Sequence, residues 1–574
     1  MTDRLKIALA QVNPTVGDVA GNLVRAREAR ARASALGADL IFFPELYVAG
    51  YPPEDLVLKP SFQAACMAAV AEFAADTADG GPAVLIGSPW RDGPRLHNAH
   101  ALLDGGAIAS LRYKVDLPNY GVFDEKRVFA PGDLPGPVHF RGVRIGVPIC
   151  EDIWGPDVVE CIAETGGEIL LVPNASPYRR DVMDERFAVA VARVKASGLP
   201  LVYLNQISGQ DELVFEGASF GLKADGSLAF LLPAFRETVV VVEAVRGARG
   251  WDLVDGDRAV TEEGLAADYA ACVLGLRDYV NKNRFPGVVL GLSGGIDSAL
   301  VAAMAVDALG PERVHAVMLP FRWTSSESLE DAAACAKLLG IRYDVVPIAD
   351  AVEGFERLLA PVFEGRAPDI TEENLQSRAR GTILMAISNK FGPMVLTTGN
   401  KSEMSVGYAT LYGDMNGGYN PIKDLYKTEV WAISRWRNAN LPAGALGPAG
   451  PVIPERIITK IPTAELRSGQ TDQDSLPPYE ILDGILECLV EKEMPLADIL
   501  AAGFDEPTVK RVERLLYVAE YKRRQAAPGV KITHRNFGRD RRYPITNGFR
   551  DPGKPVELPA APLPVGPQTD VVDF

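Results

Sequence analysis

The sequence has no long hydrophobic run and few cysteines. No stretch approaches the roughly 18 apolar residues that a membrane-spanning helix requires, and Met1 to Lys6 do not form an apolar secretory leader. The 6 cysteines are spread over 574 residues without a Cys-x-x-Cys pair, which argues against a disulfide framework and a zinc site. We therefore expect a soluble, cytoplasmic protein with no membrane partner.

Positive charge and histidine are also scarce. The chain has 59 lysines and arginines against 75 acidic residues, a net charge of −16, and only 5 histidines. Nucleic-acid binding usually requires a basic face, so we expect no nucleic-acid partner. The length allows about three to four domains, or two large α/β domains. The 47% of hydrophobic residues favours a globular protein, and we expect small-molecule substrates.

The clearest motif is a glycine- and serine-rich turn between an apolar strand, 287–292, and an alanine-rich helix, 299–309. Glycine lets the backbone approach an anion, and the N–H groups at a helix N-terminus favour negative charge. No Gly-Lys-Ser/Thr follows, so the turn is not a Walker loop, and its glycine spacing does not fit the dinucleotide fingerprint. A serine-capped surface turn is the alternative. The turn resembles the pyrophosphate loop of ATP pyrophosphatases and consists of Gly291, Leu292, Ser293, Gly294, Gly295, Ile296, Asp297 and Ser298.

The first half of the chain alternates short strands with helices, and reactive side chains stand at three strand ends. Glu45, Lys114 and Cys150 stand at or just beyond the ends of the predicted strands 39–43, 107–114 and 144–150. Because α/β proteins place chemistry at strand ends, these groups can converge on one pocket. Each alone has a simpler explanation, a buried thiol or a solvated charge, so the prediction rests on all three together.

In order and context these residues resemble the Glu–Lys–Cys constellation of nitrilase-type carbon–nitrogen hydrolases, whose fold is an α/β/β/α sandwich. The resemblance implies that Cys150 attacks an amide carbonyl and that Glu45 takes the thiol proton and returns it to the leaving ammonia. Lys114 would stabilise the oxyanion and lower the thiol pKa. In glutamine-hydrolysing members, positions matching Tyr120 and Ser176 bind glutamine.

One position departs from this family's pattern. A lysine often stands six residues after the serine and helps to hold the substrate, but here Val182 occupies that place. The candidate replacements as anchor of the glutamine carboxylate are Arg179, Arg180 and Arg186.

A change in sequence character marks the expected boundary between two domains. The first covers residues 1–245, the charged and glycine-containing stretch 246–261 is the expected linker, and the second domain covers residues 262–550. Strands and helices alternate in the second domain, which predicts a doubly wound parallel sheet. The proline-rich residues 551–574 are the expected tail.

Motifs beyond the loop resemble the NAD synthetase branch of the ATP pyrophosphatase family. They include Thr-Gly-Asn-Lys-Ser-Glu at 398–403 and Ile-Pro-Thr at 461–463. The resemblance implies that Thr398, Lys427 and Thr463 bind ATP together with the loop. Asp297 and Glu403 would hold Mg²⁺, which prefers hard oxygen ligands. The implied contacts to a deamido-NAD substrate are Asn374, Asn420 and Lys522.

Together the two halves resemble the family of glutamine-dependent NAD(+) synthetases. This resemblance implies that glutamine is hydrolysed at the first site and that the ammonia passes to the second. There ATP would adenylylate deamido-NAD, because a free carboxylate is a poor electrophile, and ammonia would convert the adenylate to NAD with release of AMP and pyrophosphate. The resemblance also implies a homo-oligomer.

Other enzyme classes fit the residues less well. An N-terminal-nucleophile glutaminase needs Cys at position 2, where Thr2 stands, and a Cys–His–Glu glutaminase needs a Gly-x-Cys-x-Gly turn, whereas Glu151 follows Cys150. The paired acids and the lysine and threonine motifs of the second half disfavour an amide hydrolase with a merely regulatory nucleotide-binding domain. The missing cysteine pair and the acidic charge disfavour a transfer-RNA thiolating enzyme.

Overall fold

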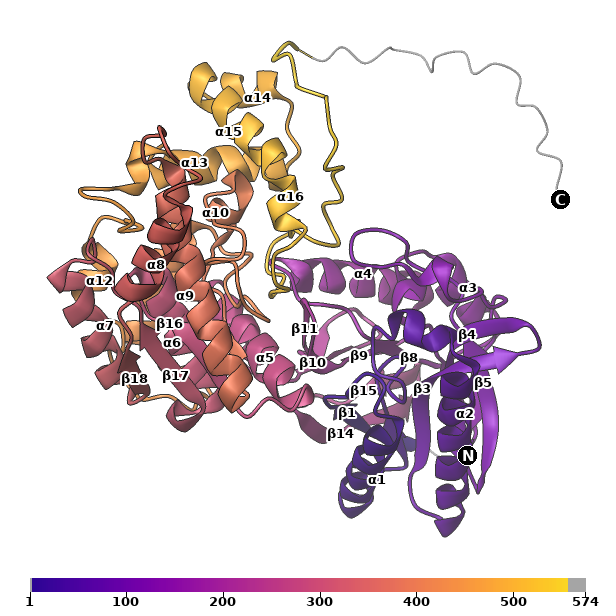
Figure 1. Ribbon diagram of the computed structural model, residues 1–574. Coiled ribbons are helices and arrows are strands. Elements are labelled where there is room, and N and C mark those ends of the chain that lie inside the picture. The colour runs from indigo at the N-terminus through magenta and orange to yellow at the C-terminus, as the bar shows by residue number, and fades with distance from the viewer. Residues whose placement is uncertain (1–2, 556–574) are drawn as a thin grey trace.

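Two stacked β-sheets form the centre of the first half of the chain in the computed structural model, which describes residues 3–555 (Figure 1). Their facing side chains, among them Leu9, Phe42 and Leu171, form one apolar core because alternate residues of a strand share a face. The first sheet has the order β15 (Gly250–Leu253), β14 (Thr238–Gly247), β1 (Arg4–Gln11), β2 (Leu40–Phe42), β3 (Ala83–Asp92), β4 (Arg95–Asp104), β5 (Ala107–Tyr113). The second has the order β13 (Leu228–Leu231), β12 (Phe220–Leu222), β9 (Leu201–Asn205), β8 (Ile169–Asn174), β7 (Val143–Gly146), β6 (Val138–Phe140).

Helices cover the outer faces of both sheets. The seven-stranded sheet packs against α1 (Val19–Ala35) and α2 (Pro60–Asp76), and the six-stranded sheet packs against α3 (Asp157–Glu164) and α4 (Val182–Ser197). Alanines on the buried side of α1, such as Ala26 and Ala33, allow that helix to lie close to the sheet. The predicted α/β/β/α sandwich is confirmed.

Two boundaries in this half differ from the sequence-based expectations. The strand expected over 144–150 ends at Gly146, and Cys150 begins a short 3₁₀ helix, because Pro148 has no N–H to donate to a sheet. The expected linker 246–261 begins too early. Its residues Trp251 and Leu253 are buried between the two sheets, on a strand that pairs antiparallel with β14, so residue 245 lies inside a hairpin.

A four-stranded parallel sheet organises the second half, in the order β18 (Arg342–Val345), β17 (Val314–Met318), β16 (Val288–Gly291), β19 (Met394–Val395). One apolar core includes residues of α5 (Leu265–Lys282), α6 (Ile296–Leu309), α7 (Ser326–Leu339), α11 (Lys427–Ala439) and α12 (Glu455–Thr459). The opposite face packs on α8 (Ala349–Leu359) and α9 (Ile370–Phe391). Helices on both faces confirm the doubly wound sheet.

A smaller helical cluster packs beside the parallel sheet, and its helices α14 to α16 belong to the yellow end of the described chain in Figure 1. It contains α10 (Lys401–Val406), α13 (Tyr479–Leu486), α14 (Leu496–Ala501), α15 (Glu506–Val518) and α16 (Glu520–Arg523). Of the expected tail, only residues 551–555 lie within the described part. Asp551 there accepts a hydrogen bond from the N–H of Leu496, 2.9 Å away, so the chain still packs on α14 at this point.

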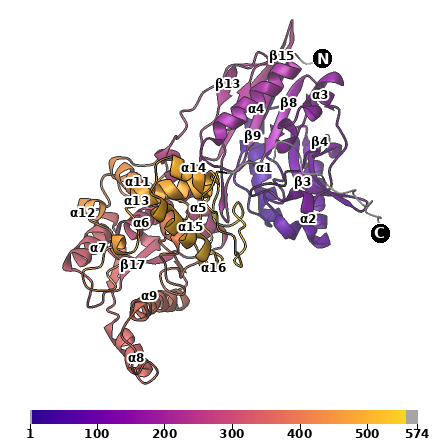
Figure 2. The same cartoon turned by 90° about the horizontal axis from the view of Figure 1, so that it is seen from above.

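The two lobes meet along α5, which faces the hairpin formed by β10 (Ile207–Gln210) and β11 (Leu213–Glu216) (Figures 1 and 2). A Cβ added to Gly209 would lie 3.0 Å from Cα of Gly275 on α5, so the backbones approach closely there. Asp278 accepts the Gly209 N–H at 2.7 Å, and Lys282 donates to the Gly209 carbonyl at 3.0 Å. Within residues 3–555, no helix is both long and apolar enough to span a membrane.

Candidate active sites

The structure brings Glu45 and Lys114 into direct contact beside Cys150. Lys114 Nζ lies 2.8 Å from Glu45 Oε1, and both side chains are fully buried. Glu45 also accepts hydrogen bonds from the side-chain amide of Asn98 at 2.7 Å and from the N–H of Ala175 at 3.1 Å. The charges of both groups act on the Cys150 thiol. Glu45 and Lys114 thus lie together as the sequence predicts, while Cys150 stands on a 3₁₀ helix four residues beyond its strand.

A second glutamate, Glu125, completes the environment of the lysine. Its carboxylate lies 3.0 Å from Lys114 Nζ and accepts a hydrogen bond from Tyr51 Oη at 2.9 Å. Sequence reasoning missed Glu125 because it begins a short 3₁₀ helix in a long connection and does not stand at a strand end. The only signal was a glutamate eleven residues after the lysine, which does not distinguish a buried partner from a surface acid.

Burial controls the protonation of this site. Desolvation and the charge of Glu45 raise the pKa of the Cys150 thiol well above its usual value, while Lys114 acts in the opposite direction. Burial by itself would lower the pKa of Lys114, but Glu125 and Glu45 outweigh it and hold that pKa high. The site thus combines a thiol, two glutamate side chains and a lysine ammonium.

The turn that carries Cys150 is held in an unusual conformation. Cys150 has a φ of 50°, in the left-handed region that costs a non-glycine residue free energy. Asp152 fixes the turn: it accepts hydrogen bonds from the N–H of Ile149 at 2.8 Å and from the N–H groups of Val115 and Asp116 at 3.0 and 2.8 Å. Asp152 thereby ties the thiol turn to the residues that follow Lys114.

The two predicted glutamine-binding residues lie on loops around the thiol. Tyr120 is 52% exposed, and its hydroxyl donates to the Glu151 carboxylate at 2.9 Å. Ser176 is buried and accepts a hydrogen bond from Arg186 Nε at 3.1 Å, and its N–H donates to Asn205 Oδ1 at 2.9 Å. Tyr120 thus contacts the residue next to Cys150, and Ser176 follows Ala175, whose N–H donates to Glu45.

The three arginines considered as replacements at Val182 have different surroundings. Only Arg186 contacts Ser176, and its charge is matched by an ion pair with Glu216. Arg180 pairs with Asp268 and Glu429 of the second lobe, and Arg179 pairs with Glu185. Arg180 is thus an interdomain residue, a role that sequence position could not reveal because its partners are 88 and 249 residues away.

The predicted nucleotide loop joins β16 to α6. Gly294 has a φ of 78°, and a Cβ there would lie 2.4 Å from the carbonyl oxygen of Ser328, so only glycine fits. Ser298 Oγ accepts from the N–H of Ser293 at 3.2 Å and donates to the carbonyl of Gly295 at 3.0 Å. The loop therefore has a fixed shape at a helix N-terminus, where backbone N–H groups favour an anion.

Two carboxylates lie beside one lysine here, Asp297 on the loop and Glu403 on α10. Lys427 makes ion pairs with Asp297 and, at 3.3 Å, with Glu403. Asn400 donates to Asp297 Oδ1 at 2.8 Å and caps α10, the helix that carries Glu403. Burial raises the pKa of Glu403, with Lys427 opposing and Asp297 adding to the shift. The three residues predicted for metal and ATP therefore form one cluster.

A cavity of about 300 Å³ opens over the loop. Its walls include the predicted residues Thr398, Asn420 and Thr463, together with Asp297, Glu403 and Lys427. Asn374 and Lys522 are absent from its walls. Asn374 accepts a hydrogen bond from Thr410 at 2.9 Å, and Lys522 donates to the carbonyls of Gly407 and Ala409 at 2.8 and 2.7 Å, so both hold the loop 407–410 beside the cavity.

Two further charged residues in the cavity wall escaped sequence reasoning. Asp472 accepts hydrogen bonds from Tyr479 at 2.9 Å and Tyr408 at 3.3 Å, and burial raises its pKa. Arg380 donates to the carbonyl of Leu319 at 2.9 Å, and burial lowers its pKa to about 10. Neither residue stands in a recognisable motif, because Asp472 lies in a long connection and Arg380 in the middle of α9.

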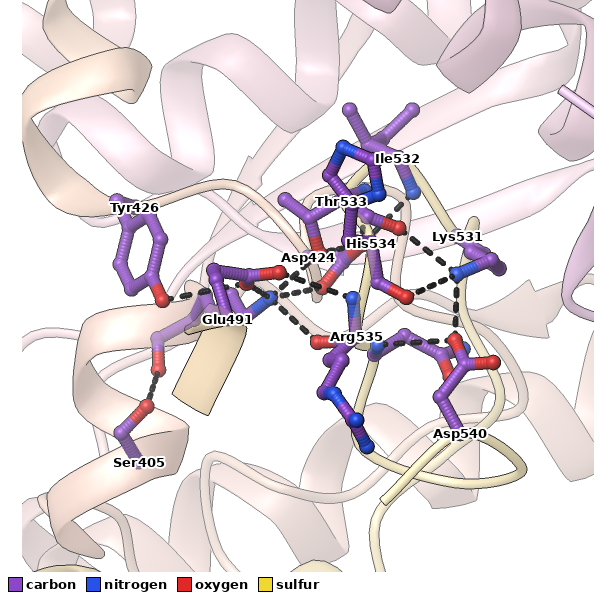
Figure 3. Close-up of polar contacts among 12 residues, drawn as sticks. Ser405, Asp424, Tyr426, Glu491, Lys531, Ile532, Thr533, His534, Arg535 and Asp540 are labelled. Atoms are coloured by element: carbon purple, nitrogen blue, oxygen red, sulfur yellow. Dashed lines mark hydrogen bonds and ion pairs between the residues drawn. The ribbon is translucent and has the colours of Figure 1, made fainter. Parts of the chain in front are cut away.

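Lys401, two residues before Glu403, lies at the centre of a buried ionic network. Figure 3 labels its partners Asp424 and Glu491. Its ammonium contacts Asp424 at 2.7 Å, Glu491, and the carbonyl of Arg535 at 2.8 Å. Burial alone would lower the pKa of Lys401, but the carboxylates of Asp424 and Glu491 raise it above its usual value. The network attaches α10 to the chain segment 531–540.

The chain matches two family models, which divide it much as the lobes do. Residues 6–250 match the carbon–nitrogen hydrolase family, and residues 268–526 match the NAD synthase family. The glutamine-dependent NAD(+) synthetase of Rhodobacter capsulatus is 55% identical over 551 residues, which covers 96% of this chain and all of the relative. That of Xanthomonas campestris pv. campestris is 49% identical and covers 95% of this chain and 98% of the relative.

A solved structure agrees with these matches. The structure of a glutamine-dependent NAD+ synthetase from Acinetobacter baumannii, in complex with adenosine diphosphate, superposes with a TM-score of 0.75 at 42% identity and covers 96% of this chain and 99% of that one. Sequence identity over the full length, the two family matches and the fold agree, and the chain belongs to the family of glutamine-dependent NAD(+) synthetases.

Proposed function

We propose that this chain converts deamido-NAD to NAD with glutamine as the nitrogen donor and ATP as the activating co-substrate. The observation that carries the proposal is the presence, in one chain, of a buried thiol–glutamate–lysine site and of a nucleotide loop at which two carboxylates pair with one lysine. The first site releases ammonia, and the second consumes it.

At the first site, Cys150 attacks the amide carbon of glutamine. Glu45 takes the thiol proton and returns it to the leaving nitrogen, which departs as ammonia and leaves a thioester. Lys114, held by Glu45 and Glu125, stabilises the negative charge on the carbonyl oxygen. Water then hydrolyses the thioester to glutamate. Tyr120 and Ser176 hold the substrate beside the thiol.

At the second site, the loop Gly291–Ser298 binds the ATP phosphates with Thr398, Lys427 and Thr463. The deamido-NAD carboxylate attacks the α-phosphorus, pyrophosphate leaves, and ammonia displaces AMP from the adenylate. Asn420 lies in the cavity wall and contacts the dinucleotide directly. Asn374 and Lys522 act on it through the loop 407–410 that they hold.

The residues of the second site fit a magnesium ion. Asp297 and Glu403 bring two hard oxygen donors to one place, and their mutual repulsion favours a cation. Mg²⁺ commonly takes one or two protein carboxylates and fills its shell with phosphates and water. Bound there, the ion would neutralise charge on the phosphates.

We also propose that the chain forms a homo-oligomer and acts in the cytoplasm. All six cysteines are unpaired, which suits a reducing compartment. Light scattering of the purified full chain measures the subunit number, and a monomer at micromolar concentration contradicts the first proposal.

Replacing Cys150 by alanine tests the two-site function. Glutamine should no longer support NAD formation, because Glu45 and Lys114 cannot replace a thiolate that forms a thioester. Ammonium should restore NAD formation, best at alkaline pH where more of it is unprotonated.

Cys161→Ala is the matched control, since Cys161 lies on the same lobe with partial exposure. Full glutamine-dependent synthesis by the Cys150 variant would contradict the first site, and loss of ammonium-dependent synthesis in a folded variant would contradict the separation of the sites.

A further inference from the structure

A second cavity, of about 370 Å³, lies between the two lobes, and one wall is formed by the segment between Tyr120 and Glu125. The first lobe contributes Glu54, Val122 and Asp124 to its walls. The second contributes residues of α16 and of the segment 537–542, which runs back toward the first lobe after the helical cluster. Neither the thiol site nor the nucleotide loop lines this cavity.

The walls carry an excess of positive charge, which is unusual in a chain of net charge −16. Three carboxylates, Glu54, Asp124 and Glu520, face five arginines: Arg523, Arg524, Arg539, Arg541 and Arg542. Glu520 is shared by three of these arginines, at 2.7 to 3.3 Å. Asp124 is already paired at 2.7 Å with Arg127, which lies outside the cavity wall. The acids present therefore do not neutralise the cavity.

The positive charge of two arginines is not fully neutralised by nearby carboxylates, so these side chains can bind an anion. Arg541 is 5% exposed, stacks on the ring of Tyr543 at 3.6 Å, and shares Glu520 at 3.3 Å. Its pKa is lowered by burial, which shows that the surrounding charges do not fully compensate its desolvation. Arg542 donates to the carbonyls of Arg539 at 2.8 Å and Gly121 at 3.4 Å, and it forms no ion pair within residues 3–555.

The wall that carries these arginines is held in place before any ligand arrives. Lys531 pairs with Asp540 and donates to the carbonyl of Thr533 at 2.8 Å (Figure 3). Arg539 pairs with Glu54 across the lobes, so the ion pair joins two walls of the cavity. A site whose groups are already ordered loses little conformational entropy when it binds.

We propose that this cavity binds an anion that carries one or two phosphate groups. The planar guanidinium presents N–H donors in a fork that matches two phosphate oxygens. The volume is within the range of small-molecule sites, roughly 300 to 1,000 Å³. The phosphate can belong to a free inorganic ion or to a nucleotide, since Val122 and Phe537 add apolar surface for a base.

Calorimetric titration of the full chain tests the proposal, with inorganic phosphate, pyrophosphate and AMP in separate arms. The variant is Arg524→Gln with Arg542→Gln, two exposed side chains of the cavity wall. The control is Arg32→Gln with Arg95→Gln, two exposed arginines of the first lobe that remove the same charge. Melting temperatures verify that both variants fold.

The parent and the control should show an anion site that the cavity variant binds at least tenfold more weakly. Binding at the nucleotide loop is recognised separately, because Lys427→Gln removes it and leaves the cavity site. Tighter binding of phosphate or pyrophosphate than of AMP identifies an inorganic ligand, and the reverse order identifies a nucleotide. Identical isotherms for parent and cavity variant overturn the proposal. A change of subunit number in the cavity variant overturns it as well, because the cavity would then be a contact between copies of the chain.

Discussion

Burial determines the reactivity of the thiol at the first site. Cys150 is 5% exposed and has a raised thiol pKa, whereas Cys161 on α3 is only partly buried. Since only the thiolate is nucleophilic, a raised pKa makes a resting cysteine unreactive at neutral pH. The enzyme therefore has to generate its nucleophile when the substrate binds.

This argument predicts the pH dependence of alkylation. Iodoacetamide should modify Cys150 slowly at pH 7, and the rate should still rise at pH 9.5, because the thiol deprotonates only above its raised pKa. Mass spectrometry of the Cys150 and Cys161 peptides from one sample compares the two rates and supplies the internal control. A Cys150 rate that reaches its plateau below pH 8 would show that Lys114 outweighs burial.

A second residue-scale prediction concerns Asp297. Asp297→Asn keeps the size of the side chain but removes the charge that pairs with Lys427 and that is proposed to hold magnesium. ATP-dependent pyrophosphate release should fall by at least 100-fold, while glutamine hydrolysis stays measurable. Asp307→Asn is unsuitable as a control because it breaks a buried pair with Arg437, so Asp350→Asn, on α8, serves instead. Unchanged pyrophosphate release refutes the assigned role.

At the scale of elements, the nucleotide loop depends on one backbone conformation. Gly294→Ala should lower the rate of ATP-dependent NAD formation at least tenfold, because a Cβ meets the Ser328 carbonyl at 2.4 Å and the left-handed φ of 78° adds strain. Gly340→Ala is the matched control: its φ is 70°, but nothing lies within 4 Å of the added Cβ. That control should lose about 1 kcal/mol of stability and keep its activity.

The secondary-structure element that carries a residue also determines whether its role could be predicted from the sequence. Glu45 and Lys114 were predictable because they closely follow strands, Cys150 because its sequence context resembles that of a known family although its strand ends at Gly146, and the loop 291–298 because a motif and its strand–helix setting coincide. Glu125 and Asp472 were not, since each begins a short 3₁₀ helix in a connection whose path depends on tertiary packing. Trp251 and Leu253 were missed because a short, polar-flanked strand resembles a linker until its partner β14 is known.

For the whole molecule, the contacts between lobes bear on how glutamine hydrolysis is coupled to NAD formation. Arg180 bridges Asp268 on α5 and Glu429 on α11, and it follows the loop that carries Ser176. Arg180→Ala leaves the two carboxylates without this partner, and breaking such a pair loosens the interface. More glutamate should then be produced per NAD than in the parent.

Coupled assays of glutamate and NAD on the same sample measure this ratio. Arg179→Ala is the control, since its partner Glu185 lies on the same lobe. Ammonium-dependent synthesis should remain within about twofold in both variants, because neither arginine lines the nucleotide cavity. An unchanged ratio in the Arg180 variant would show that this bridge does not couple the sites.

The network around Lys401 has a consequence for how the protein is made. The sheets of the first lobe are complete once Leu253 has been synthesised, whereas α10 gains its anchor only when Arg535 and Asp540 arrive. At about 5 to 20 residues per second, the interval is roughly 15 to 60 s. During translation a nascent chain can therefore acquire a folded glutamine-hydrolysing lobe well before the lobe that would use the ammonia is finished.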